Sequence, residues 1–184
     1  MNLIYIGYGL TIINYVIYCA SRYQKDKKNI LFLDLFAKTC TVFALYCFDS
    51  LTGSYIMFLK LIINVVCYTK ECKNWKLSAL YWVFEAIFVF VLWKTYNGIS
   101  SVLVFVCSSI SLVANWWLSP QYMRLSAVVG SGFYLAYQLS ISNWAGLLEV
   151  VALGSNIGAY VKYKNDSKNE VRALATGMAG GMQK

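Results

Sequence analysis

Residues 51–69 form a long and almost wholly apolar segment, LTGSYIMFLKLIINVVCYT. Polar residues bound it on both sides, with Asp49 and Ser50 before it and Lys70 after it. An α-helix rises about 1.5 Å per residue, so a segment of this length covers most of the roughly 30 Å hydrocarbon core of a bilayer. The stretch therefore predicts a membrane-spanning helix, although it contains one charged residue, Lys60.

Further apolar segments of similar length precede and follow this one. Short polar breaks separate them, and none shows the alternation of polar and apolar residues over about ten positions that is typical of a membrane β-barrel strand. The sequence therefore predicts an all-α membrane protein with seven transmembrane helices. The predicted spans are 3–20, 29–48, 51–69, 76–94, 98–117, 123–142 and 144–163.

The composition of the chain excludes several classes of protein. Of its 184 residues, 59% are hydrophobic and 13% are charged, whereas a soluble domain carries about 25% charged residues. The chain has no His, which is the usual zinc ligand and the usual base of catalytic triads. Its six Cys form no C-x-x-C motif, and we expect them to be free and to pack as small apolar side chains. We predict no metal site and no cofactor.

Positively charged residues are distributed unevenly between the predicted loops. If the amino terminus lies outside, only Lys94 falls on the outer side. Cytoplasmic loops are enriched in Lys and Arg, so the sequence predicts an outer amino terminus and a cytoplasmic carboxyl terminus. We assign the net charge of +8 to this asymmetry and not to nucleic-acid binding. The inner side receives Arg22, Lys25, Lys27, Lys28, Lys70, Lys73, Lys76, Arg124, Lys162, Lys164, Lys168, Arg172 and Lys184.

A weak internal repeat underlies the seven predicted spans. When the chain is shifted by about 92 residues, the first three spans align with the last three, and the fourth has no counterpart. The clearest identity is the pattern N-x3-Y-x-K, which occurs at 64–70 and again at 156–162. An odd helix between two three-helix units gives both units the same direction in the membrane. We predict repeats at 1–70 and 97–164, a linker helix at 71–96 and a disordered cytoplasmic tail at 165–184.

This 3+1+3 plan resembles that of the SWEET sugar facilitators, the PnuC vitamin-precursor transporters and other PQ-loop proteins. More closely, the stretch from YMR at 122–124 through WAG at 144–146 to Asn156 resembles the YgjV-type bacterial inner-membrane family. The resemblance implies a place in the bacterial inner membrane and a SWEET-like fold. Because SWEETs bind substrate with an Asn on the third and on the seventh helix, it also implies a substrate-binding role for Asn64 and Asn156. Unlike SWEETs, the chain has a single Pro, Pro120, at the start of the sixth span.

The third and seventh spans each carry a stripe of polar residues at helical spacing, and we take these residues as the candidate substrate-binding site. An ionisable side chain at mid-bilayer costs about 2.5–3.5 kcal/mol on insertion scales, so each should face a cavity or a partner. Two interpretations stay open. The stripes line a solute cavity, or Lys60 pairs with Glu149 and the Asn side chains hold the helices together through hydrogen bonds. The candidates are Lys60, Asn64, Tyr68, Glu149, Asn156 and Tyr160.

Other polar residues within the spans have simpler explanations. Asp34 and Lys38 are four residues apart on the second span and can neutralise each other. Glu85, on the unrepeated fourth span, is expected to be bonded to a neighbouring side chain. Trp116 and Trp117 lie at the end of the fifth span, where we expect membrane-interface anchors, with stacking on a ring-shaped substrate as the alternative.

The function that this pattern favours is a facilitator for a small polar solute, such as a sugar, a nucleoside or a vitamin precursor. The two repeats would rock to give alternating access. The alternative is a non-transporting membrane receptor or regulatory protein on the same fold. We expect no enzyme and no catalytic residues, because the chain lacks G-x-S-x-G, a nucleotide-binding loop and His. The expected partners are the solute and the lipid bilayer, not nucleic acid, and a homo-oligomer stays open.

Overall fold

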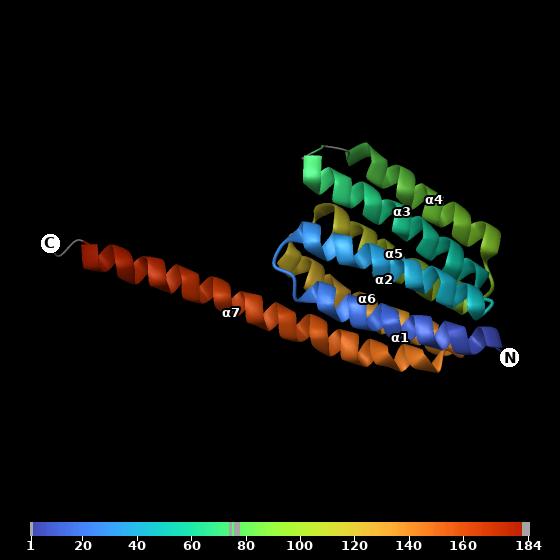
Figure 1. The fold of residues 1–184 in the computed structure, drawn as a ribbon. Helices are drawn as coiled ribbons and strands as arrows, with labels where there is room; N and C mark the ends of the chain where they lie inside the picture. Colours follow the sequence, from blue (N-terminus) through green and yellow to red (C-terminus); the bar gives the residue numbers. More distant parts are fainter. Residues whose placement is uncertain (1, 74, 76–77, 182–184) are drawn as a thin grey trace.

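Long α-helices account for almost all of the chain in a computed structural model that describes residues 2–73, 75 and 78–181, with side chains described as far as Asp166 (Figure 1). No β-strand occurs among these residues, so the predicted all-α class is confirmed. The first six predicted spans agree with the helices to within a few residues, whereas the seventh, predicted at 144–163, begins as the 3-10 helix η1 and continues as α7 to Gly181. The elements are α1 (Asn2–Arg22), α2 (Lys27–Cys47), α3 (Leu51–Lys73), α4 (Ser78–Thr95), α5 (Ile99–Trp117), α6 (Pro120–Ser140), the 3-10 helix η1 (Trp144–Leu148) and α7 (Glu149–Gly181).

Six of the helical segments described are long and apolar enough to cross a membrane, namely α1 to α5 and the segment of η1 and α7 at 144–166. The remaining helix, α6, is as long as α1 and α2. It carries buried polar side chains such as Arg124, Ser131 and Gln138, which lower its average hydropathy. These side chains point into the bundle, where other helices can satisfy them. The span predicted at 123–142 therefore stays a prediction.

Six helices form a closed ring. Along the ring, α1 packs against α2, α2 against α3, α3 against α5, α5 against α6, α6 against α7, and α7 against α1. The fourth helix, α4, lies outside the ring against α3 and α5 (Figure 1). Large apolar side chains are exposed on the outward faces, among them Val16, Phe43, Trp82, Val129 and Val151. We expect this apolar surface to contact lipid chains. Each helix satisfies its own backbone hydrogen bonds, so its backbone can lie next to lipid.

The second helix of each half of the chain ends in the same way. At the end of α2, Asp49 has a positive φ of 55°, and the amide of Ser50 donates to the carbonyl of Leu45. At the end of α6, Ser142 has a φ of 58°, and the amide of Asn143 donates to the carbonyl of Gln138. This left-handed turn with its six-to-one bond is the Schellman ending of a helix.

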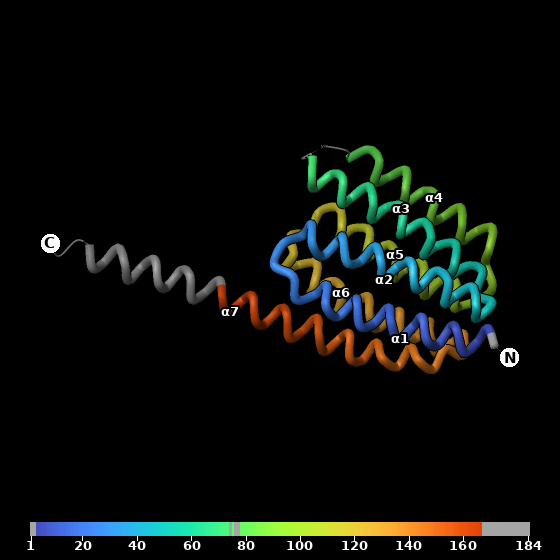
Figure 2. Tube along the Cα trace, viewed as in Figure 1, coloured from blue at the N-terminus to red at the C-terminus, as the bar shows by residue number. Residues whose placement is uncertain are grey.

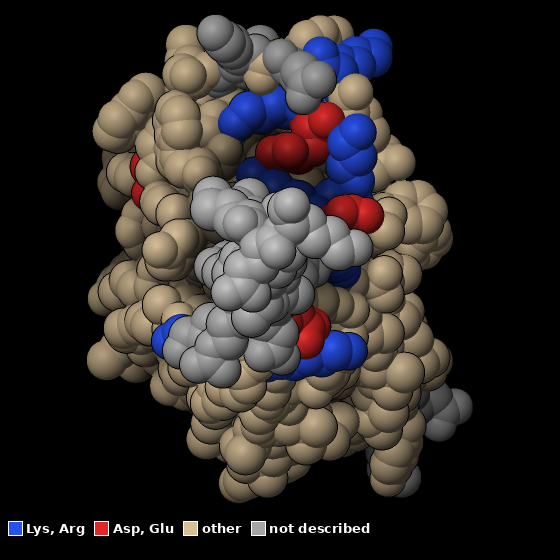
Figure 3. Space-filling model, turned by 90° about the vertical axis from the view of Figure 1, so that its left-hand side faces the viewer, with Lys and Arg blue, Asp and Glu red and all other residues tan. Residues whose placement is uncertain are grey.

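The two ends of the bundle differ in charge. We call the end that holds the α1–α2, α3–α4 and α5–α6 connections the carboxyl end, and the opposite end, where α1 begins, the amino end. Lys, Arg, Asp and Glu side chains gather over the carboxyl end (Figure 3), and α7 leaves the bundle there (Figure 2). The disordered tail predicted at 165–184 falls almost entirely on residues whose side chains lie outside the described part, and it stays a prediction.

Candidate functional site

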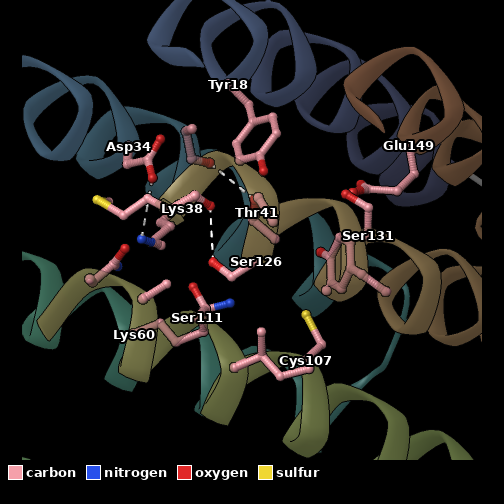
Figure 4. Close-up of a pocket in the computed structure, with 18 of the residues that line it drawn as sticks. Tyr18, Asp34, Lys38, Thr41, Lys60, Cys107, Ser111, Ser126, Ser131 and Glu149 are labelled. Atoms are coloured by element: carbon pink, nitrogen blue, oxygen red, sulfur yellow. Dashed lines mark hydrogen bonds and ion pairs between the residues drawn. The ribbon is translucent and has the colours of Figure 1, made fainter. Parts of the chain in front are cut away.

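A cavity of about 110 Å³ lies inside the ring of six helices (Figure 4). All six ring helices contribute to its wall, and none of the described residues of α4 does. On α1 its wall extends from Asn14 to Arg22, toward the carboxyl end, and on α7 it is formed by Glu149, at the start of that helix near the amino end. Its polar wall consists of Asn14, Tyr15, Tyr18 and Arg22 of α1, Asp34, Lys38 and Thr41 of α2, Lys60 of α3, Ser111 and Asn115 of α5, Ser126, Ser131 and Tyr134 of α6, and Glu149 of α7.

Three charged side chains from α1 and α2 meet in the wall of the cavity. Nη2 of Arg22 donates to both carboxylate oxygens of Asp34, at 2.6 Å from Oδ1 and 2.5 Å from Oδ2. Ser21 Oγ donates to Oδ1 at 2.7 Å. Nζ of Lys38 lies 3.8 Å from Oδ2. The predicted pairing of Asp34 with Lys38 is therefore confirmed, but it is the longer of two ion pairs that share one carboxylate.

Arg124 of α6 bonds to the end of α1 beside Arg22 and contacts α7. Its Nε donates to the carbonyl of Arg22 at 2.9 Å, and its Nη2 donates to the carbonyl of Gln24 at 2.6 Å. Its guanidinium also lies over the ring of Tyr163 on α7, at 4.3 Å from the centroid. The last carbonyls of a helix have no partner within the helix, so Arg124 satisfies the end of α1. We counted Arg22 and Arg124 among the basic residues of the inner side, and the structure buries both.

Lys60 and Glu149 both line the cavity, from α3 and α7 on opposite sides of the ring. Lys60 lies on the same side as Lys38 and Ser111, and Glu149 lies beside Ser131 (Figure 4). The ion pair that we considered between Lys60 and Glu149 does not form among the side chains described. The ion pairs found among the described side chains are Arg22–Asp34, Lys38–Asp34 and Lys27–Glu71.

Asn64 and Asn156 lie behind the wall of the cavity, and neither is exposed. Nδ2 of Asn64 donates to the carbonyl of Leu31 at 3.2 Å, and its Oδ1 accepts from Nδ2 of Asn115 at 2.9 Å. Nδ2 of Asn156 donates to Tyr18 Oη at 3.3 Å and to a carbonyl one turn earlier in α7 at 2.9 Å. Each Asn thus holds a side chain that does line the cavity, across the α3–α5 contact or the α7–α1 contact.

Tyr68 and Tyr160, the remaining candidates, are not among the residues that line the cavity. The ring of Tyr68 packs 6.0 Å from that of Phe32. The carbonyl of Tyr160 accepts from Nε2 of Gln121 at 2.8 Å. The six predicted site residues therefore divide into two that line the cavity, two that position its wall and two that lie outside it.

The sequence did not single out the hydroxyl groups of the cavity. The hydroxyls of Tyr15 and Tyr134 are buried, and they lie near the side chains of Glu149 and Gln138 without a well-formed hydrogen bond to either. Tyr15, Tyr18 and Arg22 follow one another at spacings of three and four on α1. This spacing places them on one face and is the signal that could have identified them. In a sequence with 15 Tyr the signal is weak, because Tyr is also common at membrane interfaces.

A layer of buried side chains separates the cavity from the amino end. Tyr137 Oη and Ser50 Oγ lie 2.7 Å apart and share a hydrogen bond. Nδ2 of Asn143 donates to Oε1 of Gln138 at 2.8 Å. Tyr137 packs against Tyr134 with ring centroids 5.7 Å apart. These contacts join α6 to the α2–α3 connection and to the α6–η1 connection at this end of the bundle.

Several other predicted features lie elsewhere in the fold. Oε1 of Glu85 accepts from Ser109 Oγ at 2.7 Å, which confirms the expected bond to a neighbouring side chain. Trp116 is buried against Tyr81 and Phe84 and is not an interface anchor, while Trp117 is exposed. All six Cys are free, as predicted. Among the described residues, no three His, Cys, Asp or Glu side chains form a group that could hold a metal ion.

The fold and the cavity define an integral membrane protein whose helices enclose a polar site. The sequence model of the bacterial inner membrane protein family Imp-YgjV matches residues 5–167, and the chain belongs to this family. The protein is therefore a bacterial inner membrane protein with several membrane-spanning helices. No curated protein and no solved structure matches the chain.

Replacing Asn64 by Ala is expected to lower stability more clearly than it lowers solute binding. The change leaves Asn115 Nδ2 and the carbonyl of Leu31 without their partner. Hydrogen bonds between membrane helices average about 0.6 kcal/mol, with values up to about 1.7 kcal/mol. Thermal unfolding in detergent measures the loss, and Asn156→Ala should show a similar one. A loss of binding in either variant at unchanged stability would show that the Asn itself contacts the solute.

Proposed function

We propose that the protein is a facilitator for a small polar solute that binds in the central cavity. The observation that carries this proposal is the set of buried polar atoms on the cavity wall that make no well-formed hydrogen bond to a described residue. They are Tyr15 Oη, Tyr134 Oη and Lys38 Nζ, whose ion pair with Asp34 is long at 3.8 Å. Buried polar groups are almost always satisfied in native proteins. A solute, or the water that it replaces, would satisfy these groups in the middle of the bundle.

Alternating access is supported by the way the two halves of the ring correspond. We propose that α1–α3 and α5–α7 are parallel repeats joined by α4, in the 3+1+3 arrangement. The contacts that join the two halves, α3 with α5 and α7 with α1, are equivalent under this pairing. The Schellman endings of α2 and α6 are equivalent as well. Rocking of one half against the other would open the layer around Tyr137 and expose the cavity to the amino end.

The orientation that we propose places the amino terminus outside and the carboxyl terminus in the cytoplasm. It is supported by the excess of Lys and Arg in the connections at the carboxyl end, since cytoplasmic loops carry such an excess. A fluorescent protein fused to the carboxyl terminus should therefore fluoresce, and an alkaline phosphatase fused there should be inactive. An active phosphatase fusion with a dark fluorescent fusion would reverse the orientation.

Filling the cavity is expected to abolish both binding and transport. Ala127 of α6 lines the cavity, so Ala127→Phe places a ring in the space that the solute needs. Val129, two residues on, is 55% exposed on the outer surface, and Val129→Phe is the matched control. Thermal-shift screening against sugars, nucleosides and small acids would find a solute, because a ligand that binds the native state raises stability. Uptake into proteoliposomes would then be measured for both variants.

The outcome of this experiment distinguishes the two functions considered. Uptake by the unaltered protein and by Val129→Phe, with none by Ala127→Phe, would support transport through the cavity. Binding that Ala127→Phe abolishes, without uptake by any form, would identify a receptor or regulatory protein. Equal uptake by Ala127→Phe and Val129→Phe would contradict the cavity as the solute site.

A further inference from the structure

The charges on the cavity wall do not balance. Five ionisable side chains line the cavity, three of them cations and two of them carboxylates: Arg22, Lys38, Lys60, Asp34 and Glu149. Arg22 and Asp34 neutralise each other through the two short contacts described above. The remaining charged side chains are Lys38 and Lys60 on one side of the cavity and Glu149 on the opposite side. Whether or not Glu149 carries a proton, the five side chains leave an excess of positive charge.

The excess charge is concentrated at Lys38 and Lys60. The Nζ atom of Lys38 is buried and makes no hydrogen bond to a described residue, and its ion pair with Asp34 is long, at 3.8 Å. Lys60 is 8% exposed, and among the described side chains it has neither an ion pair nor a hydrogen bond. An ammonium group buried without a counter-ion is costly. Lys38 shares the single Asp34 carboxylate with Arg22, and Lys60 has no counter-ion among the described side chains, so the two ammonium groups on the same side of one cavity form a site for a negative charge.

The side chains around the two ammonium groups would also suit a negatively charged ligand. Thr41, Ser111 and Ser126 lie on this side of the cavity (Figure 4). Hydroxyl groups donate to carboxylate and phosphate oxygens as readily as to other acceptors. Glu149, the carboxylate that would repel an anion, lies on the other side beside Ser131 (Figure 4). Thr41 Oγ1 donates to the carbonyl of Ala37 and Ser126 Oγ to that of Met123, whereas Ser111 Oγ makes no hydrogen bond to a described residue. An anionic group between Lys38 and Lys60 would therefore meet the two ammonium groups and the Ser111 hydroxyl, and it would avoid Glu149.

We propose that the solute of this cavity carries an anionic group, a carboxylate or a phosphate, that binds between Lys38 and Lys60. The inference rests on the proposed function, since it takes the cavity to be the solute site, and it narrows the solute to acids. The uncharged part of the solute lies toward Tyr15 and Tyr134, whose buried hydroxyls make no well-formed hydrogen bond to a described residue.

The test compares charged probes with their neutral counterparts. The melting temperature of the purified protein in detergent is measured with lactate and lactamide, and with glycerol 3-phosphate and glycerol, at constant ionic strength. We expect at least one acid to raise the melting temperature more than its neutral counterpart does. Lactate acting alone identifies a carboxylate, and glycerol 3-phosphate acting alone identifies a phosphate. If neither acid exceeds its neutral counterpart, the inference is wrong.

Substitutions locate the binding to the two lysines. Lys60→Met keeps the length of the side chain and removes its charge, and it should weaken the binding of the acid by about tenfold or more, because bonds to charged groups are the stronger ones. Lys38→Met should act similarly. Lys94→Met is the matched control, since Lys94 lies on α4 against Trp93 and does not line the cavity. An equal loss in Lys94→Met would mean that the acid binds through overall charge, which overturns the proposal.

The protein without any added probe provides a second measurement. Lys60→Met should raise the melting temperature of the empty protein, because it removes a buried charge that has no counter-ion. A lower melting temperature would show that Lys60 makes a stabilising contact of its own, and this would count against the anion site. If neutral probes bind and Ala127→Phe abolishes that binding, the cavity remains the solute site and only the anionic specificity fails.

Discussion

Replacing Asp34 by Asn is expected to destabilise the protein by about 3–5 kcal/mol, the usual loss when one member of a buried ion pair is removed. The variant keeps the size of the side chain but leaves Arg22 and Lys38 buried without a carboxylate. The loss would be seen as a lower free energy of unfolding in detergent. It should be larger than the loss in Asn64→Ala, where only neutral hydrogen bonds are removed.

The control for this prediction is the ion pair between Lys27 and Glu71. Its two charged atoms are 2.7 Å apart, closer than those of Lys38 and Asp34, but the Glu71 side chain is 29% exposed. Pairs in contact with solvent contribute about 0–1 kcal/mol, so Glu71→Gln should have a small effect. Equal losses in Asp34→Asn and Glu71→Gln would show that burial does not determine the strength of the Asp34 contacts.

Replacing Gly53 by Ala is expected to destabilise the protein by about 1–3 kcal/mol, the usual effect of overpacking. A Cβ atom on Gly53 would lie 2.8 Å from Cζ of Tyr137 and 3.0 Å from Ser50 Oγ, and nearer still to the Tyr137 hydroxyl. Tyr137 is 1% exposed and has no room to move away. The sign of the effect is informative, because Gly→Ala within a helix normally stabilises it by up to about 1 kcal/mol.

Gly9→Ala on α1 is the matched control for the change at Gly53. A Cβ atom on Gly9 would have no neighbour within 4 Å, so this variant should be neutral or slightly more stable. Tyr137→Phe in the Gly53→Ala background should recover part of the loss, because it removes the nearest atom but leaves the ring. If Gly53→Ala and Gly9→Ala have the same melting temperature, the closed packing at the amino end does not exist in the protein in solution.

Predictions from helical spacing were confirmed where they concerned helix position or contacts between residues close together in the sequence. The apolar segments predicted the first six helices to within a few residues, because helix length in a membrane is set by bilayer thickness, whereas α7 continues well past its apolar segment. The spacing of Asp34 and Lys38 predicted their contact, because residues four apart meet on a helix surface. The expected bond of Glu85 to a neighbouring side chain was correct, although its partner, Ser109 on α5, had not been named.

Predictions about contacts between helices were less successful. The expected anchor Trp116 is buried, because α4 covers it with Tyr81 and Phe84. The pair of Lys60 and Glu149, one of the two interpretations left open, does not form among the described side chains, because α3 and α7 lie on opposite sides of the ring. We predicted Arg22 in a loop, but in the structure it lies inside the bundle, where it forms an ion pair with Asp34 of α2.

The sequence by itself determined that this chain is a bundle of membrane helices with ionisable residues in its interior. Only the tertiary structure decided which of them reach the cavity. Lys60 and Asn64 share one face of α3, yet Lys60 lines the cavity while Asn64 is bonded behind its wall. Helical spacing specifies which residues share a face, but not which helices that face meets. The long Lys side chain extends into the cavity, whereas the short Asn amide bonds to α2 and α5, its nearest neighbours.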